Sequence, residues 1–300
     1  WPFASVGWVT SLIQRAAASQ ERINEFLKQE PEIVNPTQEE LDFQGNIEFN
    51  NVTYTYPTSN ITAVKNLSFT INKGETLAIL GRTGSGKSSV IHLLMRQFDP
   101  QEGEVLIDNK NLKEVNLEEY RKDTGVVPQE VFLFSDSIAN NIKFGLTEDR
   151  DATQEELDAV TKQAHVYHNI TDFKEGYETL LGERGVNLSG GQKQRISIAR
   201  ALMRKPKFLI LDDCLSAVDT ETEEIILSNL KPQIEKNTTL IVSHRVSSIR
   251  NADKIIVLDD GQKIEEGTHQ SLMQLKGVYA EMYQKQLLEE EESKKQVENN

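Results

Sequence analysis

The spacing of apolar residues predicts a helix, a linker and a folded domain, in that order, at the start of the chain. Apolar residues recur at helical intervals from Leu12 to Leu27 with polar residues between them, which predicts one helix that Pro31 ends. Residues 30–45 contain two prolines and, beyond Glu30, four acidic residues, so they are expected to form a linker. The folded domain is therefore expected to begin near Asn46.

Alternating and continuous apolar stretches predict strands in the body of the chain. Residues 47–49 and 64–71 alternate between apolar and polar positions, and residues 52–56 are rich in β-formers, which indicates short strands. Residues 208–211 and 239–242 are continuous apolar runs, as expected of strands buried on both faces of a parallel sheet. Further strands are predicted at residues 76–80, 105–107, 125–127 and, in a late hairpin, 255–258.

Helical spacing returns at residues 153–164 and 191–203. A mostly helical insertion is therefore expected between the strands at 125–127 and 208–211. Residues 284–300 are acidic and polar with little apolar content, and we expect a fraying helix or a disordered tail there. Together these patterns predict an α/β domain built on a parallel sheet.

Composition narrows the class of protein. The 300 residues are 37% hydrophobic and 27% charged, which allows one large domain with appendages and excludes disorder throughout. The net charge of −14 offers no basic stripe to a phosphate backbone, so nucleic acid is not expected as a partner. The single cysteine, Cys214, cannot form an internal disulfide, which is compatible with a reducing compartment.

The amino-terminal residues favour a connection to a membrane. The chain opens at Trp1 without an initiator methionine, so we expect a piece of a longer protein. Residues 1–9 are apolar and include two tryptophans, which is typical of the end of a membrane segment, although a signal-peptide remnant or a core-packing segment would have a similar composition. No window approaches the roughly 18 consecutive apolar residues of a spanning helix.

A glycine-rich loop between a predicted strand and a predicted helix indicates a phosphate site. It has the spacing G-x-x-x-x-G-K-S, in which glycines let successive N–H groups converge on one anion at the positive end of a helix. This spacing assigns Lys87 to the outer phosphates of a nucleotide and the Ser88 hydroxyl to Mg²⁺. The alternative is a glycine-rich turn with a surface lysine. We predict that the phosphates of a nucleotide are bound by the loop residues Gly81, Arg82, Thr83, Gly84, Ser85, Gly86, Lys87, Ser88 and Ser89.

Two carboxylates follow the buried strand at 208–211. In an open parallel sheet, ligands bind at the edge where such strands end, so Asp212 is suited to Mg²⁺, with Ser88 and the phosphates as further ligands. The alternative is that Asp212 and Asp213 only begin a turn. The complete phosphate loop upstream favours the functional interpretation.

A second helix start also offers backbone N–H groups to a phosphate. Ser189 is a good N-cap for the helix that follows, and two glycines expose N–H groups at its positive end. An ordinary capped helix remains the alternative. The stretch consists of Leu188, Ser189, Gly190, Gly191 and Gln192.

Residues 46–283 resemble the ATP-binding-cassette (ABC) ATPases, because four motifs appear in that family's order. Residues 81–88 resemble Walker A, 188–192 the signature motif, 208–212 Walker B, and Ser216, Ala217, Val218 and Asp219 the D-loop. The resemblance implies a P-loop NTPase (RecA-like) parallel-sheet core with an antiparallel β subdomain and a helical subdomain. It divides the chain into a membrane-helix end and connector at 1–30, a linker at 31–45, the ATPase domain at 46–283 and an acidic tail at 284–300.

The same resemblance implies roles for single residues. Tyr56 is assigned to stacking on adenine; from the residues alone, the alternative for both Tyr54 and Tyr56 is a cross-strand packing role. Gln129 is assigned to the Q-loop near Mg²⁺, and His244 to the switch histidine that contacts the γ-phosphate. The catalytic set is then Asp213, His244 and Gln129, and the Mg²⁺ set is Ser88, Gln129 and Asp212. The other histidines are expected to be structural or solvated: His92, His165, His168 and His269.

The resemblance further implies a half-transporter of the exporter type at the cytoplasmic face of the membrane. Residues 182–185 resemble the X-loop of exporters, and Glu183 in this loop, together with Gln129 in the Q-loop, would act on membrane helices. Hydrolysing members carry glutamate after Walker B, where this chain has Asp213, so slow hydrolysis at its own site is expected. The expected partners are a membrane domain and a second ABC half, with a heterodimer favoured over a homodimer. The alternatives are a soluble ABC ATPase of DNA repair or translation, and a non-hydrolysing ATP-gated binding module.

Overall fold

The computed structural model describes residues 1–146 and 150–298 and separates the chain into two units, Trp1–Val34 and Asn35–Asn300. The first unit contains helix α1, Pro2–Leu27, in which no residue is buried. The helix begins ten residues before Leu12, where the apolar pattern predicts its start. Pro2 is compatible with this start, because a proline in the first helical turn gives up an N–H that has no partner within the helix. Among the described residues, no helix combines the length and apolar content needed to cross a bilayer.

The second unit begins with an antiparallel sheet of strand order β2-β1-β4-β5. Its strands are β1 Ile47–Tyr56, β2 Ile61–Ile71, β4 Glu102–Ile107 and β5 Lys110–Asn111. The two separate strands predicted at 47–49 and 52–56 are one strand. The register of β1 shifts between Phe49 and Val52, and Asn51 takes a positive φ of 50°, so a local irregularity replaces the predicted break.

The second sheet has the strand order β10-β9-β3-β8-β7-β6. Its strands are β3 Thr76–Gly81, β6 Thr124–Val127, β7 Phe208–Asp212, β8 Thr238–Ser243, β9 Lys254–Asp259 and β10 Gln262–Gly267. All neighbours pair in parallel except β10, which forms the predicted hairpin with β9. Every residue of β3 and β8 is buried, as the continuous apolar runs predict. The predicted parallel-sheet core is confirmed.

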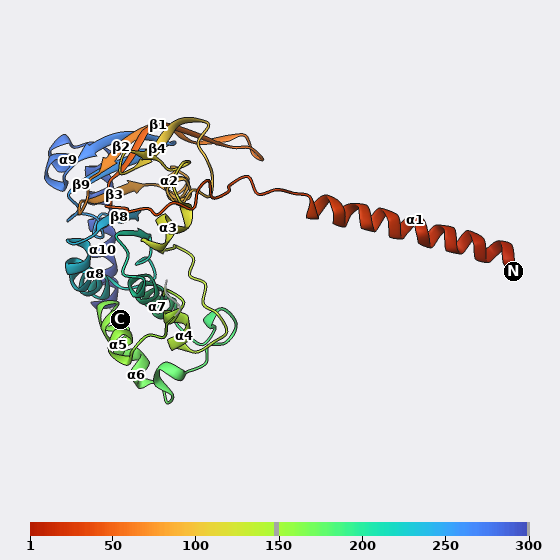
Figure 1. Cartoon of the computed structure of the whole chain (residues 1–300). Coiled ribbons are helices and arrows are strands. Elements are labelled where there is room, and N and C mark those ends of the chain that lie inside the picture. The colour runs from red at the N-terminus through yellow and green to blue at the C-terminus, as the bar shows by residue number, and fades with distance from the viewer. Residues whose placement is uncertain (147–149, 299–300) are drawn as a thin grey trace. The chain divides into compact units, whose positions relative to one another are not determined.

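The helices fall into two groups around the sheets. The predicted helical insertion contains α4 Ile138–Lys143, α5 Gln154–Gln163, α6 Tyr167–Asp172 and α7 Gly190–Met203, with short 3₁₀ turns at Gly176–Glu178 and Glu183–Gly185. In Figure 1, α4, α5 and α6 lie at the end of this unit away from β1, β2 and β4. The remaining helices are α2 Lys87–Leu94, α3 Leu117–Lys122, α8 Thr220–Ile234, α9 His269–Leu275 and α10 Val278–Glu298. Of the two alternatives for the tail, the structure has the helix, α10.

Thr238, the first residue of β8, joins the two sheets. Its side chain is buried at 1% exposure, and its hydroxyl donates to the carbonyl of Gly45 at 2.7 Å, just before β1. The same hydroxyl accepts from the N–H of Gly74 at 3.1 Å, just before β3. Two backbone groups from different parts of the chain thus depend on one buried hydroxyl.

We predict that Thr238→Val lowers the free energy of unfolding by about 1–3 kcal/mol, because valine keeps the shape but leaves both backbone groups unsatisfied. Urea unfolding followed by circular dichroism measures the change. Thr58→Val, at an exposed position in the turn after β1, is the matched control and should change the free energy by less than about 0.5 kcal/mol. Equal effects of the two substitutions would contradict the linking role of Thr238.

Candidate functional site

The predicted phosphate loop runs from the end of β3 into the start of α2. Gly86 is the N-cap of α2 with a left-handed φ of 101°, and a Cβ there would clash with the carbonyl oxygen of Ala63 on β2. A Cβ on Gly81 would clash with the Ser85 hydroxyl and lie 2.6 Å from the carbonyl oxygen of Leu258 on β9. The loop is therefore wedged between β2 and β9 at a spacing that only glycine permits.

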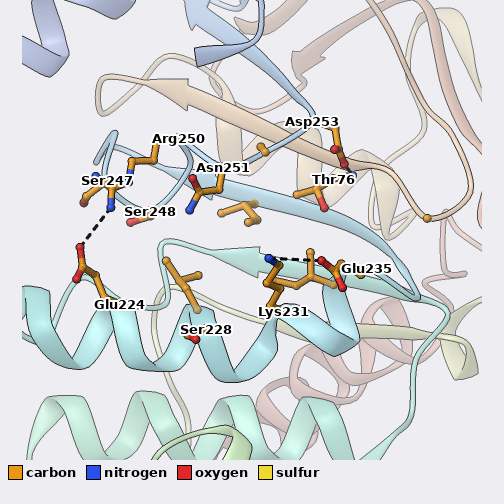
Figure 2. Close-up of a pocket in the computed structure, with 15 residues that line it drawn as sticks. Thr76, Glu224, Ser228, Lys231, Glu235, Ser247, Ser248, Arg250, Asn251 and Asp253 are labelled. Carbon is orange, nitrogen blue, oxygen red and sulfur yellow. Dashed lines mark hydrogen bonds and ion pairs between the residues drawn. The ribbon is translucent and has the colours of Figure 1, made fainter. Parts of the chain in front are cut away.

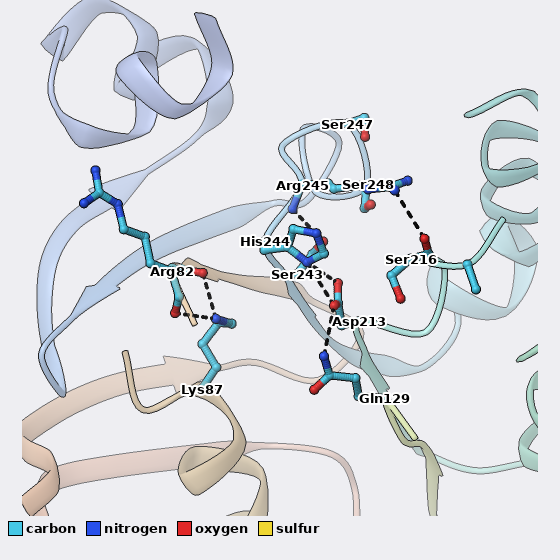
Figure 3. A network of polar contacts seen from close by, with 12 residues as sticks. Arg82, Lys87, Gln129, Asp213, Ser216, Ser243, His244, Arg245, Ser247 and Ser248 are labelled. Atoms are coloured by element: carbon cyan, nitrogen blue, oxygen red, sulfur yellow. Dashed lines mark hydrogen bonds and ion pairs between the residues drawn. The ribbon is translucent and has the colours of Figure 1, made fainter. Parts of the chain in front are cut away.

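Lys87 is the first residue of α2 and folds back over the loop. Its ammonium donates to the carbonyl oxygens of Gly81 at 2.7 Å and Arg82 at 2.9 Å (Figure 3). Burial lowers the pKa of Lys87, while the charges of Asp213 and Asp212 act in the opposite direction. A positive charge is thus held between the loop and two carboxylates.

Asp213 follows β7 in a left-handed conformation with φ 45°, and its N–H donates to the carbonyl of Val242 on β8 at 2.8 Å. Its carboxylate oxygens lie 2.8 and 2.9 Å from Nδ1 of His244, and Gln129 Nε2 donates to the same group at 3.4 Å (Figure 3). Because an ionised carboxylate only accepts, His244 Nδ1 must carry the proton. In the neutral form of the ring, Nε2 then carries no proton, and it lies on the side of the ring away from Nδ1 and Asp213.

A cavity of about 440 Å³ brings most of the predicted nucleotide residues together. Of the two candidate tyrosines, Tyr54 is buried in the core at 2% exposure, whereas Tyr56 lines the cavity and its hydroxyl lies 3.0 Å from Ser89 Oγ. Gly81, Arg82 and Ser85 belong to the loop but do not line the cavity. The predicted residues that line it are Tyr56, Thr83, Gly84, Gly86, Lys87, Ser88, Ser89, Gln129, Asp212, Asp213 and His244.

Sequence reasoning missed a second wall of this cavity. It is formed by Ile61, Thr62 and Ala63 on β2 and by Asp260 and Gly261 in the β9–β10 turn. The turn is held against the loop by the Gly261 N–H, which donates to the Ser85 carbonyl at 3.1 Å. In the sequence these residues carry only hairpin and strand signals, so no motif marks them as part of a site.

The oxygen donors in the cavity fit Mg²⁺. Ser88, Gln129 and Asp212 supply a hydroxyl, an amide oxygen and a carboxylate, which are the hard ligands that this ion prefers. Burial and the charge of Asp213 raise the pKa of Asp212 to about 6, while Lys87 lowers it. A carboxylate in that position is stabilised by a nearby cation. Among the described residues, no three His, Cys, Asp or Glu side chains gather as a metal site, so other oxygen ligands would have to complete the coordination.

The predicted signature stretch forms a separate surface. Ser189 caps α7, its hydroxyl accepting from the Gln192 N–H at 3.2 Å, and Gln192 Oε1 accepts from the Ser189 N–H at 2.9 Å. Leu188 is buried, while Ser189 and Gly190 are exposed. The five residues at 188–192 are not among those lining the cavity that contains Lys87. In a single chain, the two helix starts predicted to bind phosphate therefore lie apart.

The predicted D-loop packs against α7 and starts α8. Gln194 on α7 donates to the Ser216 hydroxyl at 3.3 Å and accepts from the Ala217 N–H at 3.1 Å. Val218 is buried, and the Asp219 carboxylate accepts from the Thr222 N–H at 2.9 Å, which caps α8. The D-loop thus holds a fixed position relative to the signature helix.

A larger cavity of about 700 Å³ lies between α8 and the segment 247–253 (Figure 2). The charges at its rim pair with each other: Glu224 with Arg250 at 3.3 Å, and Lys231 with Glu235 at 3.7 Å. None of the predicted site residues lines this cavity. The candidate chemistry therefore belongs to the smaller cavity.

Comparisons with known proteins agree with these motifs. The profile of the family described as "ABC transporter" matches residues 64–216, just over half of the chain. The chain is 43% identical, over 96% of its length and 49% of the relative's, to a probable multidrug resistance ABC transporter ATP-binding/permease protein, YheI, of Bacillus subtilis. It is 41% identical, over 96% of its length and 50% of the relative's, to an ATP-dependent lipid A-core flippase of Pseudoalteromonas translucida.

A solved structure, that of a bacterial Atm1-family ABC exporter with ATP bound, matches with a TM-score of 0.86 and 36% identity. The match covers 95% of this chain and 50% of that one. The chain thus spans about half the length of the relatives that it matches.

The hydrogen bond to Asp213 leads to a spectroscopic prediction. We expect neutral His244 to carry its proton on Nδ1, opposite to the Nε2 form that free histidine favours, because the carboxylate can only accept. Long-range ¹H–¹⁵N spectra of the chain labelled in its 5 histidines identify the protonated nitrogen. Asp213→Ala should return His244 to the Nε2 form, and an Nε2 proton already present in the unsubstituted chain would contradict the pairing.

Proposed function

The chain belongs to the ABC transporter family, and from this premise we propose that it hydrolyses ATP to drive the export of a substrate across a membrane. One observation carries the proposal: Lys87, Asp213 and His244 come from three separate segments and line one cavity of about 440 Å³. A phosphate loop, a carboxylate and an imidazole in one cavity are what ATP binding and hydrolysis need.

Each side chain then has a physical task. The loop N–H groups and Lys87 bind the β- and γ-phosphates, and Tyr56, which also lines the cavity, stacks on adenine. Ser88, Gln129 and Asp212 would hold Mg²⁺, which when bound neutralises charge on the phosphates. Asp213 orients the attacking water, and His244 approaches the γ-phosphate through its Nε2 edge. A protonated imidazole would donate from Nε2 while keeping its bond to Asp213.

We propose that the signature surface of a second ABC half completes the site. Ser189 and Gly190 are exposed at the positive end of α7 but lie outside this chain's own cavity. A head-to-tail pair would place the start of one α7 against the phosphates held by the other chain. Such pairing uses both helix starts, which a single chain leaves apart.

Hydrolysis at the chain's own site is proposed to be slow. Both oxygens of Asp213 lie within 2.9 Å of His244 Nδ1, so this short side chain is drawn toward the imidazole. Glutamate would extend the carboxylate by one C–C bond, about 1.5 Å. A displacement of about 1 Å from the reacting water can cost on the order of a hundredfold in rate. A heterodimer with a glutamate-bearing partner would then have one slow and one fast site, whereas a homodimer would have two slow sites.

An exposed apolar patch is proposed to receive the membrane domain at the cytoplasmic face. Phe132, Phe134 and Phe144 are exposed, and Phe134 contacts Phe132 edge-to-face and Phe144 at a tilt, with ring centroids 5.2 and 4.7 Å apart. Exposed Leu180 pairs with Ser137 beside them. A relative about twice as long as this chain is named as an ATP-binding/permease protein, so we assign the patch to a segment of the membrane domain. The segment that carries Gln129 leads directly into this patch, which connects the cavity to it.

We predict that Asp213→Glu raises ATP turnover by about 10- to 100-fold, because it restores the reach of the base. Phosphate release in the presence of Mg²⁺ measures turnover. Calorimetry should show equal ATP affinity for the wild-type chain and for Asp213→Glu. Asp259→Glu makes the same change at the exposed end of β9 and should leave the rate unchanged.

A wild-type rate equal to or above that of Asp213→Glu would remove the slow-site proposal. Failure of the chain to bind ATP, with Lys87→Ala behaving as wild type, would overturn the proposed function. ATP binding without turnover, alone or with any partner, would leave the non-hydrolysing module.

A further inference from the structure

A side chain on the last helix, α10, forms hydrogen bonds with the backbone on both sides of Arg245, next to His244. Gln286 of α10 donates from Nε2 to the His244 carbonyl at 2.7 Å, and its Oε1 accepts from the Val246 N–H at 2.7 Å. One amide thus bonds to the backbone on both sides of Arg245, in the way a neighbouring strand would. Residues 244–248, termed here the histidine loop, follow β8 and carry His244 into the cavity.

We propose that Gln286 is a positioning residue for His244, so that α10 sets where the imidazole stands in the nucleotide cavity. This inference rests on the proposed role of His244 at the γ-phosphate. The His244 side chain is 46% exposed, so packing alone does not fix it. Its place is defined by hydrogen bonds, to Asp213 from the ring and to Gln286 from the backbone.

The first turn of α10 is held by hydrogen bonds to β10, so the helix can fix the position of Gln286 relative to the sheet. Glu265 on β10 accepts from the N–H groups of Val278 at 2.6 Å and Tyr279 at 3.1 Å, which ties down the first turn of the helix. Tyr279 is fully buried, and its hydroxyl lies 2.7 Å from His269 Nδ1. Gln286 follows about two turns later, on a helix whose start is fixed to the sheet.

The opposite side of the histidine loop is held by other groups. Arg245 donates to the carbonyl of Ser216 in the D-loop at 3.2 Å (Figure 3) and pairs with Glu223 on α8 at 3.4 Å. The Glu223 side chain is only 2% exposed and also accepts from Ser248. These contacts fix Arg245 and Ser248 but leave the carbonyl of His244 to Gln286. Loss of the Gln286 amide should therefore release the residue that carries the imidazole, with the rest of the loop still attached.

The kinetic test is Gln286→Met, which keeps a long helix-forming side chain and removes both hydrogen bonds. We expect turnover to fall about tenfold, since small displacements of catalytic groups are costly, and the ATP dissociation constant to stay within about twofold. Gln284→Met is the matched control, because Gln284 is exposed on the same helix and its side chain has no hydrogen-bond partner among the described residues. It should behave as wild type.

A double-mutant cycle separates positioning from general stability. In a His244→Ala background, Gln286→Met should cause no further loss of turnover, because the side chain that it positions is gone. An equal loss in both backgrounds would overturn the proposal.

The second readout does not depend on activity. In ¹⁵N-histidine spectra, Gln286→Met should shift or broaden the His244 signals and leave the signals of the other histidines in place. Gln286→Glu, which keeps the acceptor for Val246 but loses the donor to His244, should move the same signals if the methionine variant folds poorly. If the Gln286 variants move the His244 signal but the chain shows no ATP turnover, the positioning role is supported and the proposed function fails. An unmoved His244 signal in both folded variants would overturn the positioning role, whatever the turnover.

Discussion

The site depends on the adjacency of three parallel strands that end at the same edge of one sheet. Strand β8 lies between β3 and β7, and the register pairs Leu80 with Ser243 and Asp212 with Val242. The residues that follow each strand, the phosphate loop, Asp213 and His244, are therefore brought together by backbone hydrogen bonds formed in the core. The Asp213 N–H to the Val242 carbonyl extends that ladder by one bond and aims the carboxylate at His244.

This adjacency explains what could be predicted from the sequence. The continuous apolar runs before Gly81 and Asp212 indicate buried parallel strands, and parallel strands share an edge, so the loop and the carboxylates were expected to meet. The glycine spacing of the loop could also be recognised in the sequence, because the whole motif lies within eight consecutive residues. His244 is a lone histidine, and only the family resemblance distinguished it from a structural one.

Other features have no local signal. The irregularity at Asn51 that fuses two predicted strands depends on the pairing of β1 with β2, which no short pattern contains. The second wall of the cavity depends on the contact between Gly261 and Ser85, which are 176 positions apart in the sequence but hydrogen-bonded in the structure. Gln286 occupies an ordinary polar position of a polar helix, so its hydrogen bonds to the histidine loop can be recognised only once the structure places α10 against that loop.

The arrangement also accounts for what one chain lacks. The two helix starts predicted to bind phosphate, at Lys87 and at Ser189, belong to different surfaces, and we propose that a second ABC half brings such surfaces together around one nucleotide. The most direct measurement mixes two inactive chains in an Asp213→Glu background: Lys87→Ala, which keeps its signature, and Gly190→Asp, which keeps its phosphate loop. We predict that each chain is inactive alone and that the mixture recovers ATP turnover, because one composite site is intact. A mixture no more active than the sum of its parts would contradict it.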